Sequence, residues 1–319
     1  MNTNTLLKVQ ELTKYFKTKK GMLHAVDHVS FSIEKGKTLG VVGESGCGKS
    51  TTGRSILRLI EPNSGKVWFD GIDLLSLNQE EMRKRRTELQ IIFQDPFSSL
   101  NPRKTISETI EEPMRLHNLV ADKKKRQLKV AQLMDTVGLA RRLYNAYPHE
   151  LDGGRRQRIG IARALSMNPK FIVCDEPVSA LDVSIQAQIL NLMKEVQEQL
   201  GLTYLFITHD LSVVYHFSDE IAVMYLGQII EKAPSDELFA NPMHPYTRAL
   251  LSAILVPSLH DKKERVIMKG EISSPINPGP FCRFANRCAN VFDRCTREVP
   301  ALRLKNPNHE VACFLYTGE

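Results

Sequence analysis

The sequence lacks the features that would place it inside a membrane or outside the globular proteins. None of its apolar runs approaches the roughly 18 consecutive residues that a membrane-spanning helix needs. Residues 1–5 carry neither the basic patch nor the apolar core of a secretory signal, so we do not expect one. Internal repeats and long low-complexity segments are also missing. With 42% hydrophobic and 25% charged residues, the chain is not collagen-like, disordered or integral to a membrane.

The charge of the chain is only mildly one-sided. It has 43 Lys and Arg against 36 Asp and Glu, a formal net charge of +7. Two basic clusters, 83–86 and 123–126, have acidic residues beside them. A solvated helix face is the simpler interpretation of each cluster, and a surface that meets anionic lipid or a cytoplasmic loop is the alternative. No motif supports nucleic-acid binding, so we expect no nucleic acid among the partners.

Strand and helix patterns alternate along most of the 319 residues, a length that suits one large α/β domain with an appendage, or two domains. The expected strands are 6–12, 29–33, 38–42, 66–69, 171–174 and 203–207. The expected helices are 49–60, 106–116, 123–137, 154–165 and 184–199. This alternation favours a mainly parallel sheet. Near Asn241 the pattern changes, and the tail is richer in Pro, Asn and Cys.

A glycine-rich loop separates the expected strand 38–42 from the expected helix 49–60. It fits the pattern G-x-x-x-x-G-K-[ST], and its residues are Gly43, Glu44, Ser45, Gly46, Cys47, Gly48, Lys49 and Ser50, followed by Thr51. The glycines let backbone N–H groups face phosphate oxygens, and the helix adds its positive N-terminus. Lys49 would reach the β- and γ-phosphates, the Ser50 hydroxyl would bind Mg²⁺, and Cys47 would fill space in the loop. The sequence therefore predicts a nucleoside-triphosphate site.

Two acidic residues follow the apolar strand 171–174. Asp175 stands where a Mg²⁺ partner of a phosphate loop belongs, either bound directly or through water. Glu176 can polarise an attacking water, which is the remaining requirement for hydrolysis. Consecutive acids would in isolation indicate the start of a helix. Together with a phosphate loop, they predict the hydrolytic part of the site.

Further motifs resemble those of one family and stand in its order. Residues 151–155, Leu-Asp-Gly-Gly-Arg, resemble the signature of ATP-binding cassette (ABC) ATPases, usually Leu-Ser-Gly-Gly-Gln. Other matching residues are Gln94 of the Q-loop, Ser179 and Asp182 of the D-loop, His209 as the switch histidine, and Phe16, or less well Tyr15, as the aromatic that stacks on adenine. The resemblance implies that Gln94 senses metal and attacking water and contacts the membrane partner, and that His209 contacts the γ-phosphate. Gln94 thereby joins Ser50 and Asp175 as an expected Mg²⁺ contact.

The resemblance also implies an architecture and a mechanism. We expect an α/β fold of the ABC type: a P-loop domain over residues 1–240 with a mixed sheet, an antiparallel β subdomain and a helical subdomain at about 95–165. Residues 241–319 would form a small Cys-rich extension. Two such domains meet head to tail in this family, and each ATP lies between one phosphate loop and the other chain's signature. ATP therefore stabilises the closed dimer, and hydrolysis lets it open.

The signature departs from the family pattern at two of its four expected contact residues, Asp152, Gly153, Gly154 and Arg155. Asp152 replaces a serine whose hydroxyl can donate to a γ-phosphate oxygen, whereas a carboxylate only accepts. Aspartate remains a good helix N-cap. Arg155 and Arg156, at i+3 and i+4, are placed to offset its charge. These changes predict a pair of unequal ATP sites formed with a non-identical ATPase partner.

Two segments indicate the branch of the family. Residues 241–251, with the run His244-Pro245-Tyr246, resemble the C-terminal extension of ATPases that serve dipeptide and oligopeptide importers, a branch that includes nickel importers. Residues 97–103 resemble the same branch. The His-Pro-Tyr run also suits an ordinary helix start with proline at the first position.

The branch implies partners and a location. We expect two membrane permease subunits that dock on the helical region, and a solute-binding protein outside the cytoplasm that acts indirectly. The chain itself would be peripheral, on the cytoplasmic face of the membrane. A nickel or other small-solute importer is the alternative, and a soluble ABC protein of translation or repair is a weaker one, because a single set of motifs is present.

Four cysteines close to the C-terminus call for a joint explanation: Cys282, Cys288, Cys295 and Cys313. Four thiolates can hold a [4Fe–4S] cluster or a tetrahedral Zn²⁺. A disulfide is disfavoured in a reducing cytosol, and the absence of a C-x₂-C pair weakens zinc. Members of the peptide-importer branch carry a C-terminal iron–sulfur cluster, so the resemblance implies [4Fe–4S]; zinc and free thiols remain alternatives.

Overall fold

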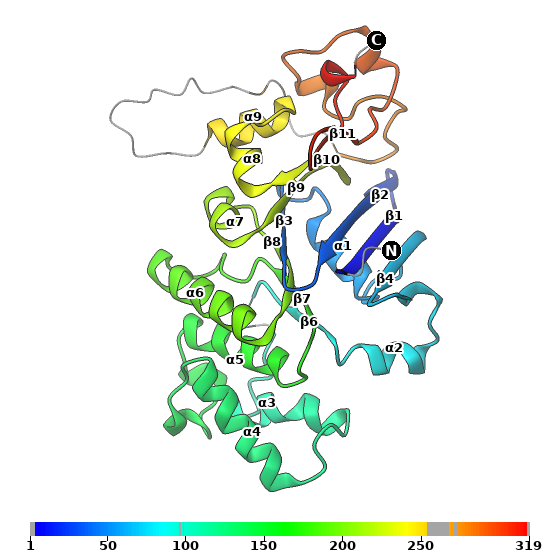
Figure 1. Cartoon of the computed structure of the whole chain (residues 1–319). Helices are drawn as coiled ribbons and strands as arrows, with labels where there is room; N and C mark the ends of the chain where they lie inside the picture. Colours follow the sequence, from blue (N-terminus) through cyan, green and yellow to red (C-terminus); the bar gives the residue numbers. More distant parts are fainter. Residues whose placement is uncertain are drawn as a thin grey trace, which may run out of the picture. The chain divides into compact units, whose positions relative to one another are not determined.

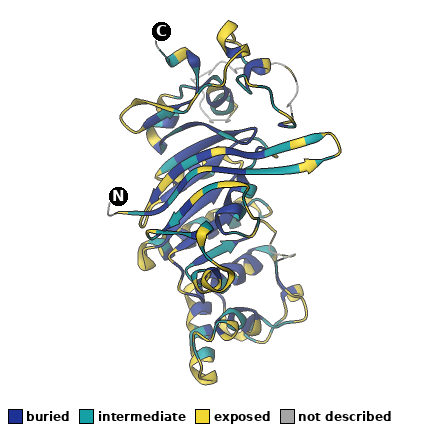
Figure 2. Cartoon of the chain, turned by 90° about the vertical axis from the view of Figure 1, so that its right-hand side faces the viewer, coloured by how far each residue is buried: buried dark blue, intermediate teal, exposed yellow. Residues whose placement is uncertain are grey.

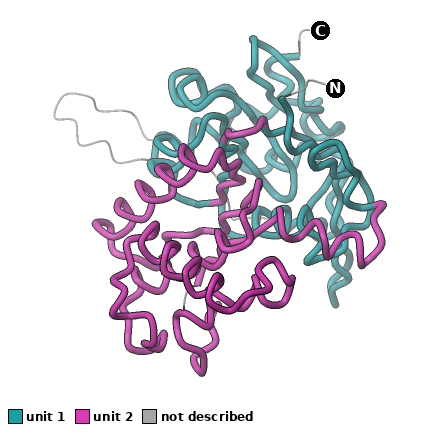
Figure 3. Tube along the Cα trace, turned by 60° about the horizontal axis from the view of Figure 1, so that its bottom comes forward, with its two compact units in different colours: residues 1–33, 38–75, 208–319 teal, residues 34–37, 76–207 magenta. Residues whose placement is uncertain are grey.

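The structure, a computed structural model, describes residues 4–95, 97, 99–253, 268, 270 and 274–317. It divides into two compact units (Figure 3). The first unit comprises 1–33, 38–75 and 208–319, and the second comprises 34–37 and 76–207. The expected boundary near residue 240 remains a prediction.

The first unit contains an antiparallel β subdomain. Its strands run in the order β2-β1-β4-β5 (Figure 1). Their bounds are β1 Thr5–Thr18, β2 Gly21–Glu34, β4 Ser64–Phe69 and β5 Ile72–Asp73. The two long strands extend well beyond the expected 6–12 and 29–33, because hydrogen bonding between them carries their polar ends, whose sequence lacks a clear apolar alternation.

A second group of strands in this unit is mixed. The order is β11-β12-β10-β9-β3, in which β3 and β9 are parallel and the other neighbours are antiparallel. The bounds are β3 Thr38–Val42, β9 Glu220–Tyr225, β10 Gln228–Pro234, β11 Arg303–Asn306 and β12 His309–Val311. The helices are α1 Lys49–Ile56, α7 Leu211–Phe217, α8 Ser235–Ala240 and α9 Pro245–Ser252. α7 packs on β3, and α8 packs on β9 and β10. α1 ends at Ile56, four residues before the expected position 60. Arg58, just beyond this end, has a positive φ of 50° that does not continue a helix.

The second unit combines parallel strands with helices. The strands β6 Leu89–Ile92, β7 Phe171–Asp175 and β8 Thr203–Ile207 lie in the order β8-β7-β6. The helices are α2 Gln79–Arg85, α3 Ile106–Leu116, α4 Lys123–Thr136, α5 Gly153–Leu165 and α6 Val183–Leu200. α3, α4 and α5 pack on one another, and all three lie within the expected 95–165 region, whose bounds as a subdomain remain a prediction.

Burial explains why the central strands read as continuous apolar runs. All residues of β3, β7 and β8 are buried (Figure 2). Parallel strands covered on both faces lose the polar alternation of half-exposed strands. The strands are therefore held by packing on both faces, and residues of the expected site lie at their ends and in the loops that follow them. No helix in the described part of the chain is long and apolar enough to cross a lipid bilayer.

Candidate active site

The phosphate loop follows β3 directly and has the backbone that its glycines predict. Gly43, Gly46 and Gly48 have φ values of 152°, 79° and 107°. A Cβ at Gly43 would lie 2.2 Å from the carbonyl oxygen of Met224, and one at Gly48 would lie 2.0 Å from that of Ala25. Only glycine fits both the conformation and the space at these two positions.

The end of the loop carries a buried positive group and a helix start. Lys49 is buried, and its ammonium donates to the carbonyl oxygens of Gly43 at 2.7 Å and Glu44 at 3.1 Å. Ser50 and Thr51 lie in the first turn of α1, where no side chain caps the helix. Backbone N–H groups at such a helix start favour phosphate. Cys47 is buried as expected of a filler, and burial raises the pKa of its thiol.

The second unit supplies the acidic residues at the end of β7. Asp175 is its last residue and is buried. Glu176 extends the pairing with β8 by donating its N–H to the Ile207 carbonyl at 2.9 Å, and its backbone has a positive φ of 50°. The Gln94 amide donates to the Glu176 carboxylate at 3.0 Å. The structure thus brings together a Q-loop glutamine and an acid that are 82 residues apart.

The signature segment begins α5 and touches the D-loop region of the same unit. The Asp152 carboxylate caps the helix by accepting the Arg155 N–H at 2.8 Å, as expected, and it lies 3.5 Å from the Arg155 guanidinium. Arg156 was also expected to offset the charge of Asp152, and this expectation was wrong. It is buried, donates to the Pro148 carbonyl at 2.7 Å and stacks on the Phe97 ring.

Close packing explains the two glycines of the signature. A Cβ on Gly153 would lie 3.0 Å from a methyl of Leu181, and one on Gly154 would lie 2.7 Å from a methyl of Ile185. Leu181 lies between Ser179 and Asp182 in the D-loop segment, and Ser179 donates its hydroxyl to the Glu176 carbonyl at 3.2 Å. The signature segment, the D-loop segment and the expected hydrolytic acid, Glu176, are therefore linked within one unit.

Two expected contact residues lie elsewhere in the first unit. His209 is exposed on the turn before α7. Phe16 and Tyr15 are neighbours on β1 and so face opposite sides of the strand. Tyr15 stacks on His24 at 3.9 Å and donates its hydroxyl to Asp27. The assembly of all these residues around one nucleotide remains a prediction.

The His-Pro-Tyr run is a helix start, as its residue types predict. The His244 ring caps α9 by accepting the Tyr246 N–H at 3.0 Å, and Pro245 is the first helical residue. Tyr246 is fully buried, and its hydroxyl accepts the N–H of Glu44 in the phosphate loop at 3.0 Å. The contact between this run and the loop could not be expected from the sequence.

The four C-terminal cysteines converge on one small pocket. Cys282, Cys288, Cys295 and Cys313 all line it, together with His244 and Phe314. Burial raises the pKa of the Cys282 and Cys313 thiols to about 11, and the neighbouring cysteines add to this rise. In the part of the chain that the structure describes, no three His, Cys, Asp or Glu side chains lie close enough to hold a metal ion.

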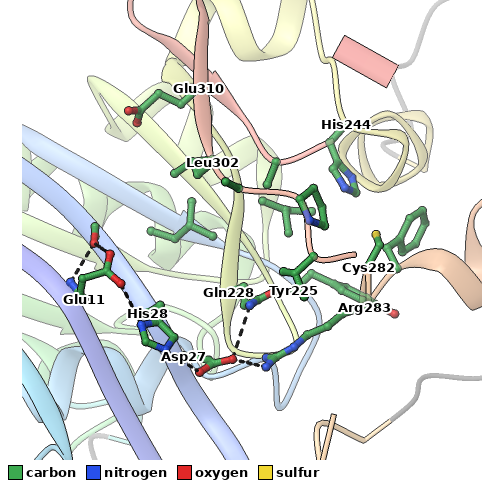
Figure 4. A pocket seen from close by; sticks show the side chains of 18 residues that line it. Glu11, Asp27, His28, Tyr225, Gln228, His244, Cys282, Arg283, Leu302 and Glu310 are labelled. Carbon is green, nitrogen blue, oxygen red and sulfur yellow. Dashed lines mark hydrogen bonds and ion pairs between the residues drawn. The ribbon is translucent and has the colours of Figure 1, made fainter. Parts of the chain in front are cut away.

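A larger cavity of about 470 Å³ lies between β1, β2, β10 and the C-terminal segment (Figure 4). The buried Asp27 carboxylate on its wall accepts from Arg283, Tyr15 and Gln228. Burial raises the pKa of Tyr15 to about 12, with a further contribution from Asp27. Burial alone would raise the pKa of Asp27, but Tyr15, Arg283 and the nearby histidines outweigh it and lower that pKa. Sequence reasoning missed this group, whose only signal was an arginine directly after Cys282.

A phosphate loop after a buried strand, a helix that starts at the signature segment, and the bond from Gln94 to Glu176 are the features of one class of protein, the ABC-type ATPases. The ABC transporter family matches residues 26–179. The solved ATP-binding cassette MJ0796, a dimer in a post-hydrolysis state with ADP and Pi, is 31% identical, with a TM-score of 0.66 over 72% of this chain and 99% of that one. CbiO1 of Clostridium perfringens, part of the ABC transporter complex cbiONQ, is 28% identical, with a TM-score of 0.67 over 75% of this chain and 92% of that one.

The branch is equally clear from the remainder of the chain. The family described as the oligopeptide/dipeptide transporter C-terminal region matches residues 230–295. The oligopeptide transport ATP-binding protein AppF of Bacillus subtilis is 50% identical over 99% of both chains. The dipeptide transport ATP-binding protein DppF of Haemophilus influenzae is 48% identical over 97% of this chain and 96% of its own. The chain therefore belongs to the ATP-binding proteins of the oligopeptide and dipeptide ABC transporters.

Proposed function

We propose that this protein hydrolyses ATP to power the import of dipeptides or oligopeptides through separate permease subunits. Full-length similarity to AppF and DppF carries the assignment of cargo class. The loop at Gly43–Ser50 and the Gln94–Glu176 contact supply the chemistry. Vesicles that contain the chain with its permease and ATPase partners should take up labelled peptide only with ATP. Uptake of nickel but not of peptide would overturn the cargo assignment.

The residues divide the work of hydrolysis. Lys49 and the N–H groups of the loop hold the β- and γ-phosphates, and Glu176 accepts the proton of the attacking water while Gln94 orients the carboxylate. Mg²⁺, when bound, would neutralise phosphate charge, and Ser50, Asp175 and Gln94 are the residues that would hold it. The remaining expected contacts are His209 to the γ-phosphate and Phe16 to adenine.

The partners follow from the head-to-tail dimerisation on which the ATPase cycle depends. We propose a head-to-tail dimer with a non-identical ATPase chain, in which the signature of each chain completes the other's site. Val183, next to the D-loop, exposes 82% of its surface, which suits a dimer contact. Phe97 and Leu116, with 59% and 57% exposed, are exposed apolar side chains of the helical region that we assign to contacts with permease loops. The chain would thereby sit peripherally on the cytoplasmic face of the membrane, with a solute-binding protein acting indirectly on the other side.

The two ATP sites of this dimer would differ. The chain's own loop, Glu176 and His209 would form a full hydrolytic set, whereas the site completed by Asp152 and Arg155 would meet a carboxylate instead of a hydroxyl. Single-turnover hydrolysis in the reconstituted pair tests this, and we expect two unequal rates. Equal rates that stay unchanged in Asp152→Ser would contradict it.

We further propose that residues 241–319 form a small Cys-rich extension of the peptide-importer type whose four cysteines hold a [4Fe–4S] cluster. The support for this proposal is the donor set, because four thiols line one pocket. Among the described residues, the positions of these thiols do not themselves form a metal site. Ligation requires the loss of the thiol protons. Anaerobically purified protein should contain about four irons and four sulfides per chain. If the purified protein instead contains one zinc per chain, the cysteines hold Zn²⁺ and the cluster is refuted. If it contains neither iron nor zinc, the four thiols are free.

A further inference from the structure

Glu44 introduces a negative charge into a loop built to hold phosphate. It is the second residue of the loop, directly after Gly43. A carboxylate there repels a nucleoside triphosphate, and repulsion in a partly buried site is weakly screened by water and salt. Lys49 lies on the backbone carbonyls of the loop, so a second positive group that pairs with the Glu44 carboxylate would offset this repulsion.

The C-terminal region supplies that group. Arg287 donates to both oxygens of the Glu44 carboxylate, at 2.8 and 3.0 Å. The two side chains are only 7% and 17% exposed. A two-pronged guanidinium–carboxylate pair fixes orientation as well as charge. The partners are 243 residues apart in the chain.

Arg287 is itself firmly held. It ends the short 3₁₀ helix Ala285–Arg287, and its guanidinium lies over the Tyr225 ring, 5.9 Å from the centroid. The rings of Tyr225, Tyr246 and Phe284 pack on one another with centroids 4.7 to 5.6 Å apart. Tyr246 of this cluster also accepts the Glu44 N–H. Two elements of the C-terminal region, α9 and the 3₁₀ helix 285–287, thus hold Glu44 of the phosphate loop. Tyr246 binds its backbone N–H, and Arg287 binds its carboxylate.

We propose that Arg287 is a positioning residue for ATP binding: it masks and orients the Glu44 carboxylate so that the phosphate loop accepts a polyphosphate. The inference rests on the ATP-binding function given above. It makes the C-terminal region part of the nucleotide site, since the loop keeps its anion preference only while that region is in place.

The charge mask makes a prediction that a purely structural role does not. The full-length chain is titrated with ATP, ADP and AMP in the presence of Mg²⁺, and the ATP-to-AMP affinity ratio is measured. Arg287→Ala exposes the carboxylate, and we expect ATP affinity to fall on the order of tenfold, ADP less and AMP little. Arg287→Ala combined with Glu44→Gln removes both charges, and the ratio should return toward that of the unmodified chain.

Two further variants keep the test decisive. Arg297→Ala removes an exposed arginine of the same region, paired with Asp293 at 2.8 Å on the surface, and should leave the ratio unchanged. Glu44→Gln alone leaves an uncompensated cation beside the phosphates and should raise the ratio, a result that does not depend on the folding of Arg287→Ala.

Each outcome separates the possibilities. Equal loss of all three nucleotides in Arg287→Ala, or a double variant as weak as Arg287→Ala, would overturn the charge mask. A ratio that Glu44→Gln leaves unchanged would overturn it as well. Failure of the unmodified chain to bind ATP would instead overturn the proposed function.

Discussion

Glu176 shows how a single residue can be held ready for chemistry. Its backbone has a φ of 50°, a conformation uncommon outside glycine, and residues with such backbones cluster at functional sites. The bond from its N–H to Ile207 and the bond from Gln94 to its carboxylate fix both ends of the residue.

Removing the basic oxygen of Glu176 should stop hydrolysis but not binding. We expect Glu176→Gln to slow ATP hydrolysis by about a hundredfold or more, since a positioned general base contributes about 10² to 10⁴. Nucleotide affinity should change little. Glu198→Gln, on the exposed face of α6, is the matched control. Unchanged turnover in Glu176→Gln would mean that another residue is the base.

His244 gives the chain a residue-level sensitivity to acid. It is fully buried, and burial lowers its pKa to about 4, against the opposing effect of Glu231. A neutral folded histidine stabilises the protein above its unfolded pKa of about 6.5, and this stability is lost as the pH falls toward 4, up to about 3 kcal/mol. We expect the melting temperature to drop over this window and to drop less in His244→Asn, which keeps a capping acceptor. Parallel pH curves for both proteins would refute this.

At the scale of elements, the sequence predicts those features that depend only on residues close together in the chain. The phosphate loop, the caps at Asp152 and His244, and the buried strand 171–174 each depend on neighbours within a few residues, so their patterns suffice. The long ends of β1 and β2 do not, because pairing between strands overrides a weak apolar pattern. Arg156 was wrongly expected to face Asp152, since an apolar ring and a carbonyl on other elements hold it instead.

Gly154 and Gly160, two of the three glycines of α5, provide a matched pair for the packing of this helix. A Cβ on Gly154 meets Ile185 at 2.7 Å, whereas one on Gly160 meets nothing within 4 Å. We expect Gly154→Ala to destabilise the protein by about 1 to 3 kcal/mol through overpacking. Gly160→Ala should stabilise it by about 0.5 to 1 kcal/mol, the helix preference for alanine. Thermal melting measures both, and shifts of the same sign would contradict the packing argument.

For the molecule as a whole, the decisive contacts join remote segments and therefore could not be predicted. Motif order was enough to expect an ABC fold and its contact residues, because each motif is a local string. The pairs Arg287–Glu44 and Arg283–Asp27 link positions 243 and 256 residues apart. Their residue types carry no mark of the partner. The sequence thus indicates what the loop binds, while the structure shows what holds the loop.

Glu231 also joins segments that are remote in the chain, and it yields a prediction for the whole fold. Its fully buried carboxylate on β10 accepts the backbone N–H groups of Met243 and His244 at 2.6 and 2.9 Å, and it lies 2.8 Å from Nε2 of His309 on β12. An amide offers one acceptor oxygen where the carboxylate offers two. We therefore expect Glu231→Gln to cost about 3 kcal/mol, as breaking a buried pair does.

The pH dependence of that cost identifies its source. Burial alone would lower the pKa of His309, but Glu231 and Glu237 outweigh it and raise that pKa. Stability from a raised histidine pKa is fully present below the unfolded value of about 6.5 and is lost as the pH rises through the folded value. The melting temperature of Glu231→Gln should therefore fall further below that of the unmodified chain at pH 6 than at pH 9. Glu298→Gln, an exposed partner of Arg294, should show no measurable change at either pH. A Glu231→Gln deficit that is equal at both pH values would assign the cost to the two backbone bonds alone, because those donors do not titrate.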